Sequence, residues 1–104
     1  MSLNVSFHEL ARSDLYSAWI WYEEQRTGLG DQFSDAVDSV LRRIARWPNS
    51  GSPTLHNERD QIVERKLPTP GFPYVIRYRL IGDAVMVMAV SHQHRHPVAE
   101  TDRE

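Results

Sequence analysis

The chain has 104 residues, of which 40% are apolar and 25% are charged, so it is long enough for one globular domain with its own core. It contains no cysteine, which excludes a disulfide framework and a thiolate metal site, and no apolar run reaches the roughly 20 residues that span a membrane. The net charge is −2, whereas proteins that mainly bind nucleic acid usually carry a basic surplus. These properties predict a single cytoplasmic domain over residues 1–104, with a polar tail over residues 98–104.

The first half of the chain predicts a strand followed by two helices. Residues 3–7 alternate as a short strand does, and Ser6 or His8 can cap the helix that follows. Gly28 suits the left-handed residue that ends many helices. The second helix is predicted to begin at Asp31 and to end at Trp47, because a residue before proline is pushed out of helical geometry. The apolar positions recur at helical spacing: Ala11, Leu15, Ala18, Trp19 and Tyr22 in the first helix, and Phe33, Ala36, Val37, Val40, Leu41 and Ile44 in the second.

The second half predicts a loop and three strands. Residues 48–53 are rich in Pro, Asn, Ser and Gly, which is typical of a loop. Runs at residues 61–67, 74–80 and 84–91 read as strands, and Gly82 before Asp83 has the chemistry of a type II′ hairpin. The predicted fold is therefore α+β with the order β-α-α-β-β-β, in which an antiparallel helical hairpin packs on one face of a small, mostly antiparallel sheet. The three tryptophans are better explained by packing within the helical hairpin than by base stacking, although Trp21 and Ile20 lie off the main apolar stripe and could form a patch for a partner.

Positive charge is concentrated in this second half. Residues 1–61 carry a net charge of −3, and residues 62–97 carry a net of +3. Strand alternation places Tyr74, Ile76, Tyr78 and Leu80 on one face, with Arg77 and Arg79 on the other. The expectation from residue type is that the tyrosine face packs on the helices and that the arginines are solvated. Alternation also separates Arg65 from Lys66, but the register between the strands is not readable from the sequence.

Histidines follow the last strand at positions 92, 94 and 96. Their alternation could suit a metal, yet no carboxylate or cysteine accompanies them, so we expect no metal site and no cofactor. A proton-transfer role for His92 or His94 is chemically possible because imidazole titrates near neutral pH. Histidines at strand ends are more often polar surface residues.

Several short elements, in this order and spacing, resemble the RelE/ParE superfamily of bacterial type II toxins, also called plasmid stabilisation proteins, over about residues 5–97. They are Asp14-Leu15, Trp21-Tyr22-Glu23, Leu29-Gly30 before Phe33, Arg65, Phe72-Pro73-Tyr74 with Ile76 and Tyr78, His92, and Arg95 two residues before Pro97. The resemblance implies a cytoplasmic toxin with a cognate antitoxin whose C-terminal segment, acidic and apolar in many pairs, wraps the sheet and the helical hairpin. Homodimer formation is compatible with it.

The resemblance leaves two activities open. In the ribonuclease branch, which cleaves messenger RNA on the ribosome, an arginine follows the tyrosine of the third strand and a tyrosine lies beyond the C-terminal arginine. This chain has Val75 at the first position and no tyrosine after Tyr78. These departures favour the ParE-like branch. Toxins of that branch are known for poisoning DNA gyrase, and this activity of the toxin is not enzymatic. A non-toxic relative of the fold is the third possibility.

Each of the first two hypotheses predicts a different set of functional residues. For the ParE-like reading, the partner-binding residues are Arg65, Arg77, Arg79, His92 and Arg95. For the ribonuclease alternative, Arg65, Lys66 and Arg95 would stabilise the reacting phosphate, while His92 or His94 would act as acid or base.

Overall fold

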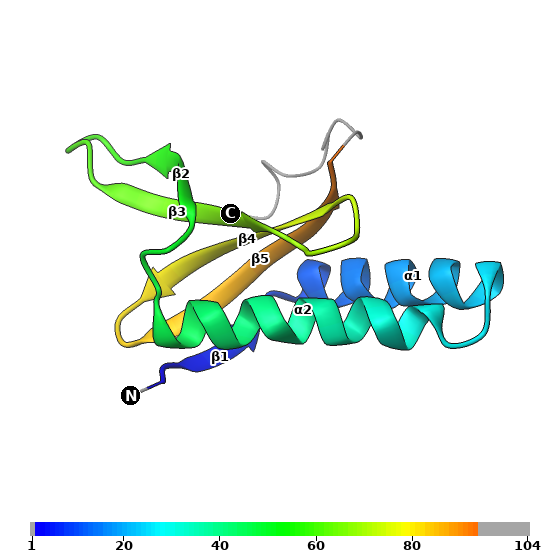
Figure 1. The fold of residues 1–104 in the computed structure, drawn as a ribbon. Coiled ribbons are helices and arrows are strands. Elements are labelled where there is room, and N and C mark those ends of the chain that lie inside the picture. Colours follow the sequence, from blue (N-terminus) through cyan, green and yellow to red (C-terminus); the bar gives the residue numbers. More distant parts are fainter. Residues whose placement is uncertain (1, 94–104) are drawn as a thin grey trace.

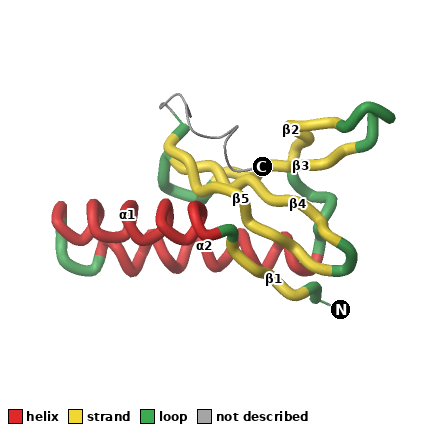
Figure 2. Tube along the Cα trace, turned by 180° about the vertical axis from the view of Figure 1, so that it is seen from behind, coloured by secondary structure: helices red, strands yellow, loops and turns green. Residues whose placement is uncertain are grey.

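The computed structural model describes residues 2–93, which fold into two layers (Figure 1). The elements are β1 (Asn4–Phe7), α1 (Glu9–Gln25), α2 (Leu29–Arg46), β2 (Ser52–His56), β3 (Ile62–Pro68), β4 (Tyr74–Ile81) and β5 (Ala84–His92). The five strands form one sheet in the order β1-β5-β4-β3-β2, in which only β1 and β5 run parallel. Both helices cover the same face of this sheet, and Figure 2 shows the same layers from behind. The predicted α+β class and the helical hairpin on one sheet face are confirmed.

The structure has one strand, β2, that was not predicted. β2 begins at Ser52, inside the stretch that we expected to be a loop, and it pairs antiparallel with β3 from Ser52 opposite Lys66 to His56 opposite Ile62. The element order is therefore β-α-α-β-β-β-β. β2 is an edge strand with a mostly exposed burial pattern and a proline, Pro53. An edge strand tolerates proline because one of its sides needs no ladder hydrogen bonds, so its composition resembles that of a loop.

The turn between the helices is held by the side chain of Glu23. Its Oε1 accepts hydrogen bonds from the backbone N–H groups of Gly28 and Gly30, both at 2.9 Å. Gly28 has a φ of 91°, the left-handed conformation expected from the sequence, and α2 begins directly after it, two residues before Asp31. The carboxylate thus satisfies N–H groups at the start of α2 that have no partner within the helix. Asp31 instead accepts a hydrogen bond from Trp19 Nε1 at 3.2 Å.

The core lies between α1, α2 and the central strands β4 and β5. Its largest fully buried side chains are Tyr78, Phe33, Ile44, Ile76, Val37, Val85 and Val87. At one end, Tyr22, Phe33, Phe72 and Tyr74 form an aromatic cluster with tilted and edge-on ring contacts. The expectation of packing in the hairpin is wrong for Trp47, which is 60% exposed, whereas Trp21, placed off the apolar stripe by the sequence, is 52% exposed. None of the helices in residues 2–93 is both long enough and apolar enough to span a membrane.

A bulge in β5 is tied to the first helix. Arg77 faces Ala89 and Tyr78 faces Val87, so Met88 is an extra residue in β5. Beyond the bulge β5 no longer pairs with β1, and the N–H of Val90 donates to Asp14 Oδ2 of α1 at 3.1 Å. The hairpin between β4 and β5 has a positive φ at Gly82 but not at Asp83, which is the pattern of a type II′ turn.

Tyr78 fixes the chain after α2 to the sheet, and its hydroxyl offers a test. The side chain is 1% exposed; its Oη accepts from the N–H of Gly51 at 3.0 Å and donates to the carbonyl of Pro48 at 2.7 Å. Tyr78→Phe would leave both backbone groups without this partner, so we expect the free energy of unfolding to fall by about 1–3 kcal/mol. Urea unfolding measures this, with Tyr16→Phe as the control because Tyr16 is 65% exposed. Equal stability of the two variants would show that the hydroxyl contributes nothing.

Candidate functional site

The sheet face that points away from the helices carries the charged side chains of the central strands. Lys66 of β3 lies opposite Arg77 of β4, and directly opposite residues of an antiparallel pair point to the same side. Alternation adds Glu64 from β3 and Arg79 from β4 to this face. We call this face, defined by Glu64, Lys66, Arg77 and Arg79, the basic face. It carries three cations and one carboxylate, which agrees with the predicted concentration of positive charge.

Glu64 connects three strands within the basic face. Its side chain is only 3% exposed, and its carboxylate accepts from Arg77 Nη1 at 2.8 Å and from Arg79 Nε at 3.1 Å. Thr54 Oγ1 of β2 donates to the same carboxylate at 2.9 Å. Hydrogen bonds in which both groups are ionised are shorter and stronger than neutral ones, so the arginine side chains are held in place.

The prediction that Arg77 and Arg79 are solvated is therefore wrong. Their side chains are 15% and 18% exposed, and both are paired with Glu64. Alternation along β4 correctly predicted that Arg77 and Arg79 share one face of the sheet. It could not predict that both arginines pair with Glu64 of the neighbouring strand β3. The role of Glu64 does not follow from the sequence, because its partners depend on the register between β3 and β4.

Arg65 lies on the other face of the sheet. It is opposite Tyr78, and its Nη1 donates to the backbone carbonyls of Gly51 at 2.8 Å and Asn49 at 3.3 Å. The structure thus separates Arg65 from Lys66, Arg77 and Arg79, and gives it a contact with the loop that follows α2.

His92 lies at the end of β5, opposite Tyr74, and the two rings meet edge-on with centroids 5.2 Å apart.

Burial, and secondarily the neighbouring Tyr74, raises the pKa of Tyr22 in the adjoining aromatic cluster, so Tyr22 stays uncharged at neutral pH. His94 and Arg95, the remaining predicted site residues, lie outside the described residues. Within residues 2–93, no group of three His, Asp or Glu side chains is arranged to hold a metal ion.

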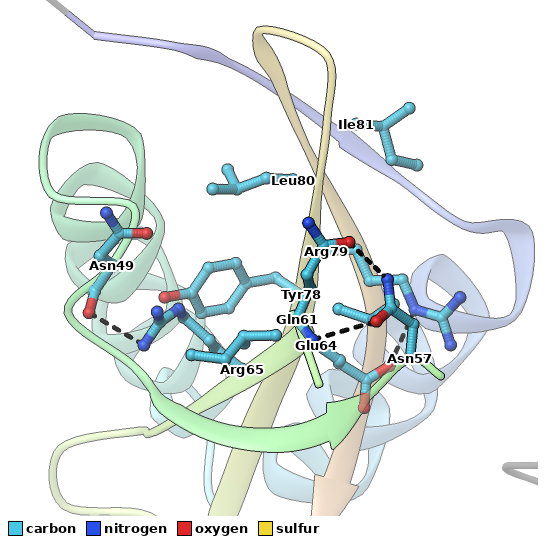
Figure 3. Close-up of a pocket in the computed structure, with 11 residues that line it drawn as sticks. Asn49, Asn57, Gln61, Glu64, Arg65, Tyr78, Arg79, Leu80 and Ile81 are labelled. Carbon is cyan, nitrogen blue, oxygen red and sulfur yellow. Dashed lines mark hydrogen bonds and ion pairs between the residues drawn. The ribbon is translucent and has the colours of Figure 1, made fainter. Parts of the chain in front are cut away.

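A cleft of about 480 Å³ opens between β3 and β4 (Figure 3). The cleft is lined by three polar residues of the loops, Asn49, Asn57 and Gln61, and by residues of the two strands. The strand residues are Ile62, Val63, Glu64, Arg65, Tyr78, Arg79, Leu80 and Ile81. Nothing in the sequence predicted this cleft, since it depends on where the two strands stop pairing.

Comparison with known proteins agrees with the fold and with the order of these elements. Residues 5–97 match the family model of the ParE toxin of the type II toxin–antitoxin system parDE. The chain is 26% identical over 100 residues to Toxin ParE2 of Mycobacterium tuberculosis strain CDC 1551 / Oshkosh, covering 95% of this chain and 90% of that protein, and equally so to Toxin ParE2 of strain ATCC 25618 / H37Rv.

Among solved structures, a chain from the chromosomal ParDE toxin–antitoxin system of P. aeruginosa superposes with a TM-score of 0.70 at 12% sequence identity. The match covers 88% of this chain and 96% of that chain, and at this identity it shows the shared fold. The family model spans most of the sequence, from residue 5 to residue 97. The chain therefore belongs to the ParE toxin family of type II toxin–antitoxin systems.

Proposed function

We propose that this ParE-family toxin acts in the cytoplasm by binding DNA gyrase, that it cleaves no RNA, and that a cognate antitoxin neutralises it. The observation that argues against RNA cleavage is the placement of the residues that a ribonuclease would need. Lys66 lies on the basic face, whereas Arg65 lies on the opposite face against Tyr78. A phosphate held by one of these side chains is out of reach of the other.

His92 is also distant from Arg65 and Lys66. It pairs with Tyr74, and Arg65 pairs with Tyr78, four residues further along β4. At the strand rise of about 3.3 Å per residue, these positions are separated by about 13 Å along the strand. Acid–base catalysis requires the proton donor within hydrogen-bond reach of the reacting group. The arrangement of Arg65, Lys66 and His92 thus supports a binding function over phosphoryl transfer.

The basic face supports a protein partner. Arg77 and Arg79 are held by Glu64, and Lys66 beside them is exposed. Positive side chains that are fixed before binding lose little conformational entropy on contact with an acidic partner, and their field accelerates the encounter. In the proposed assembly, the basic face and His92 contact gyrase or the acidic part of the antitoxin, and Arg95 belongs to the same set.

Expression without the antitoxin tests the proposal. The protein is induced in a bacterial host while pulse-labelled protein synthesis and a DNA-damage reporter are followed together. We expect the reporter to rise within the first generation while translation continues, and purified protein to inhibit supercoiling by gyrase. Early loss of translation with a silent reporter would show messenger RNA cleavage instead. Normal growth with folded protein would show a non-toxic relative.

A conservative substitution on the basic face refines this test. Arg79→Lys retains the charge near Glu64 but loses the planar guanidinium, so we expect about ten-fold weaker inhibition of supercoiling. Arg59→Lys is the matched control, because Arg59 lies in the exposed turn between β2 and β3. Circular dichroism before and after heating confirms that both variants are folded. Equal inhibition by the two variants would remove Arg79 from the binding surface.

A further inference from the structure

β3 and β4 separate before either strand ends. Their ladder stops after Arg65 opposite Tyr78. On the far side of this pair, β3 has three more residues, 62–64, and β4 has three more, 79–81. We call these two stretches the cleft segments, because the cleft lies between them (Figure 3). Figure 1 shows the β2–β3 hairpin diverging from the β4–β5 hairpin at this point.

The cleft segments match each other residue by residue. Continuation of the register of the ladder would place Glu64 opposite Arg79, Val63 opposite Leu80 and Ile62 opposite Ile81. The first of these pairs has opposite charges and the other two are apolar, and both kinds of pair stabilise adjoining antiparallel strands. The charged pair is already in contact, since Arg79 Nε donates to Glu64 Oε1 at 3.1 Å. The residues of the cleft segments therefore suit three more pairs than the ladder contains.

The apolar side chains of the cleft segments are exposed while the strands are apart. Ile62, Leu80 and Ile81 are 44%, 40% and 57% exposed. In the continued register, Ile62 and Ile81 lie directly opposite each other on the sheet face that points away from the helices. Pairing of the cleft segments would remove part of this apolar surface from water, which favours closure of the cleft.

The backbone of Leu80 also faces the cleft. The carbonyl of Tyr74 accepts a hydrogen bond from the N–H of Thr69 at 2.8 Å, so Tyr74 is a position of β4 that bonds toward β3. Such positions recur at every second residue, and this phase directs the N–H and C=O of Leu80 toward β3 as well. The described ladder stops short of Leu80. Closure would pair these backbone groups with those of Val63.

A bulge in β3 explains why the strands separate at this point. β3 pairs with β2 through Glu64 opposite Leu55 and Ile62 opposite His56, so Val63 is an extra residue in β3. Bulges bend a strand and increase its twist. The bulge lies two residues from the last pair of the β3–β4 ladder, and it turns the end of β3 away from β4. The backbone at Val63 is therefore the place where β3 can bend.

We propose that the β2–β3 hairpin is a hinged arm with two states, the open state described above and a closed state in which the β3–β4 ladder extends to Ile62 opposite Ile81. In the closed state the bulge at Val63 straightens, and Val63 and Leu80 pair through their backbones. Glu64 keeps its contact with a β4 arginine in both states, so the arm pivots beside it. A hinge that bends at a few residues is a common basis of conformational change. Closure removes the cleft, so the state of the arm controls access to the residues that line it.

A disulfide across the closed register tests the proposal, because the chain contains no cysteine of its own. Ile62→Cys with Ile81→Cys creates a non-hydrogen-bonded pair in the closed state, whose Cα atoms lie about 4.5 Å apart, within the range of a disulfide. Gln61→Cys with Ile81→Cys is the matched control, because alternation directs the side chain of residue 61 to the opposite face of the sheet. We expect the first pair to form an intramolecular disulfide at least about ten-fold faster than the control pair, in which the Cβ vectors point apart.

Amide hydrogen exchange shows whether the disulfide has captured the closed state. In the oxidised Ile62→Cys/Ile81→Cys protein we expect the amides of Val63 and Leu80 to exchange as slowly as that of Ile76, which faces β3 within the ladder. Reduction should restore fast exchange. Equal oxidation rates of the two cysteine pairs would overturn the proposal. Fast exchange of Leu80 in the oxidised protein would overturn it too.

The wild-type protein provides a measurement that needs no substitution. Opening and closing of a hinged element occurs on the microsecond-to-millisecond scale, which NMR relaxation dispersion detects. We expect dispersion at the amides of Val63 and Leu80 and none at Ile76. Flat dispersion at all three amides would overturn the proposal even if the cysteine variants do not fold. None of these outcomes depends on gyrase inhibition or RNA cleavage.

Discussion

Replacing Glu64 by glutamine is expected to lower the free energy of unfolding by about 2–4 kcal/mol, because it removes the charge that Arg77 and Arg79 share in a mostly buried position. Glutamine has nearly the same shape, so the loss reports the charge rather than the packing. Its amide also turns a donor toward two guanidinium groups that are themselves only donors. Denaturant unfolding of the wild type and the variant measures the difference.

Two further variants identify which interaction is lost. Thr54→Val removes the hydroxyl that donates to the same carboxylate and is expected to cost only about 1 kcal/mol. Glu58→Gln makes the same chemical change as Glu64→Gln at an exposed position in the turn and should leave stability within about 0.5 kcal/mol of wild type. If Glu64→Gln is as stable as Glu58→Gln, the carboxylate does not hold the two arginines, and the basic face is not fixed in advance.

Replacing Gly30 by alanine is expected to destabilise the helical hairpin by about 1–3 kcal/mol through overpacking. A Cβ at this position would lie 2.7 Å from Glu23 Cγ and 2.8 Å from the carbonyl oxygen of Trp19. The backbone oxygen cannot move independently of α1, so the two helices must separate at this end. Without that contact the substitution would stabilise, because alanine favours a helix by about 1 kcal/mol over glycine. The sign of the change therefore reports the close approach directly.

Gly28→Ala distinguishes crowding from backbone strain. A Cβ there would have no atom within 4 Å, but φ is +91°, which L-residues rarely adopt. The expected cost is about 1–2 kcal/mol, from conformation alone. Thermal unfolding of both variants, followed by circular dichroism, makes the comparison. A Gly30→Ala protein more stable than wild type would mean that the hairpin relaxes freely at this point.

Local chemistry in the sequence was sufficient for most of the fold. Helical spacing of apolar residues predicted both helices, Gly28 predicted the turn between them, and Gly82 predicted the β4–β5 hairpin. β2 was missed because an edge strand with Pro53 and mostly exposed residues has the composition of a loop. Predicted helix and strand ends were otherwise within two residues for α2 and the strands β3, β4 and β5.

The site was less predictable than the fold because it depends on pairing between strands. Alternation placed Arg77 and Arg79 on one face and Arg65 apart from Lys66, as the structure has them. Neither the burial of the two arginines nor the role of Glu64 follows from alternation, since both require the register that sets β3 against β4. The cleft depends on the residue at which that pairing stops, and no local pattern marks this point.

The pairing of β1 with β5 has a consequence for how the protein is made. Asn4 lies beside Ala84, so these partners are eighty positions apart in the chain, and β5 also contacts α1. Contacts so distant in sequence form slowly, because the loop between them must close before they contribute. The helical hairpin can form as soon as it leaves the ribosome, but β1 has no sheet partner until β5 has been synthesised. The complete fold, and any toxicity that depends on it, therefore arises only after β5 has been synthesised.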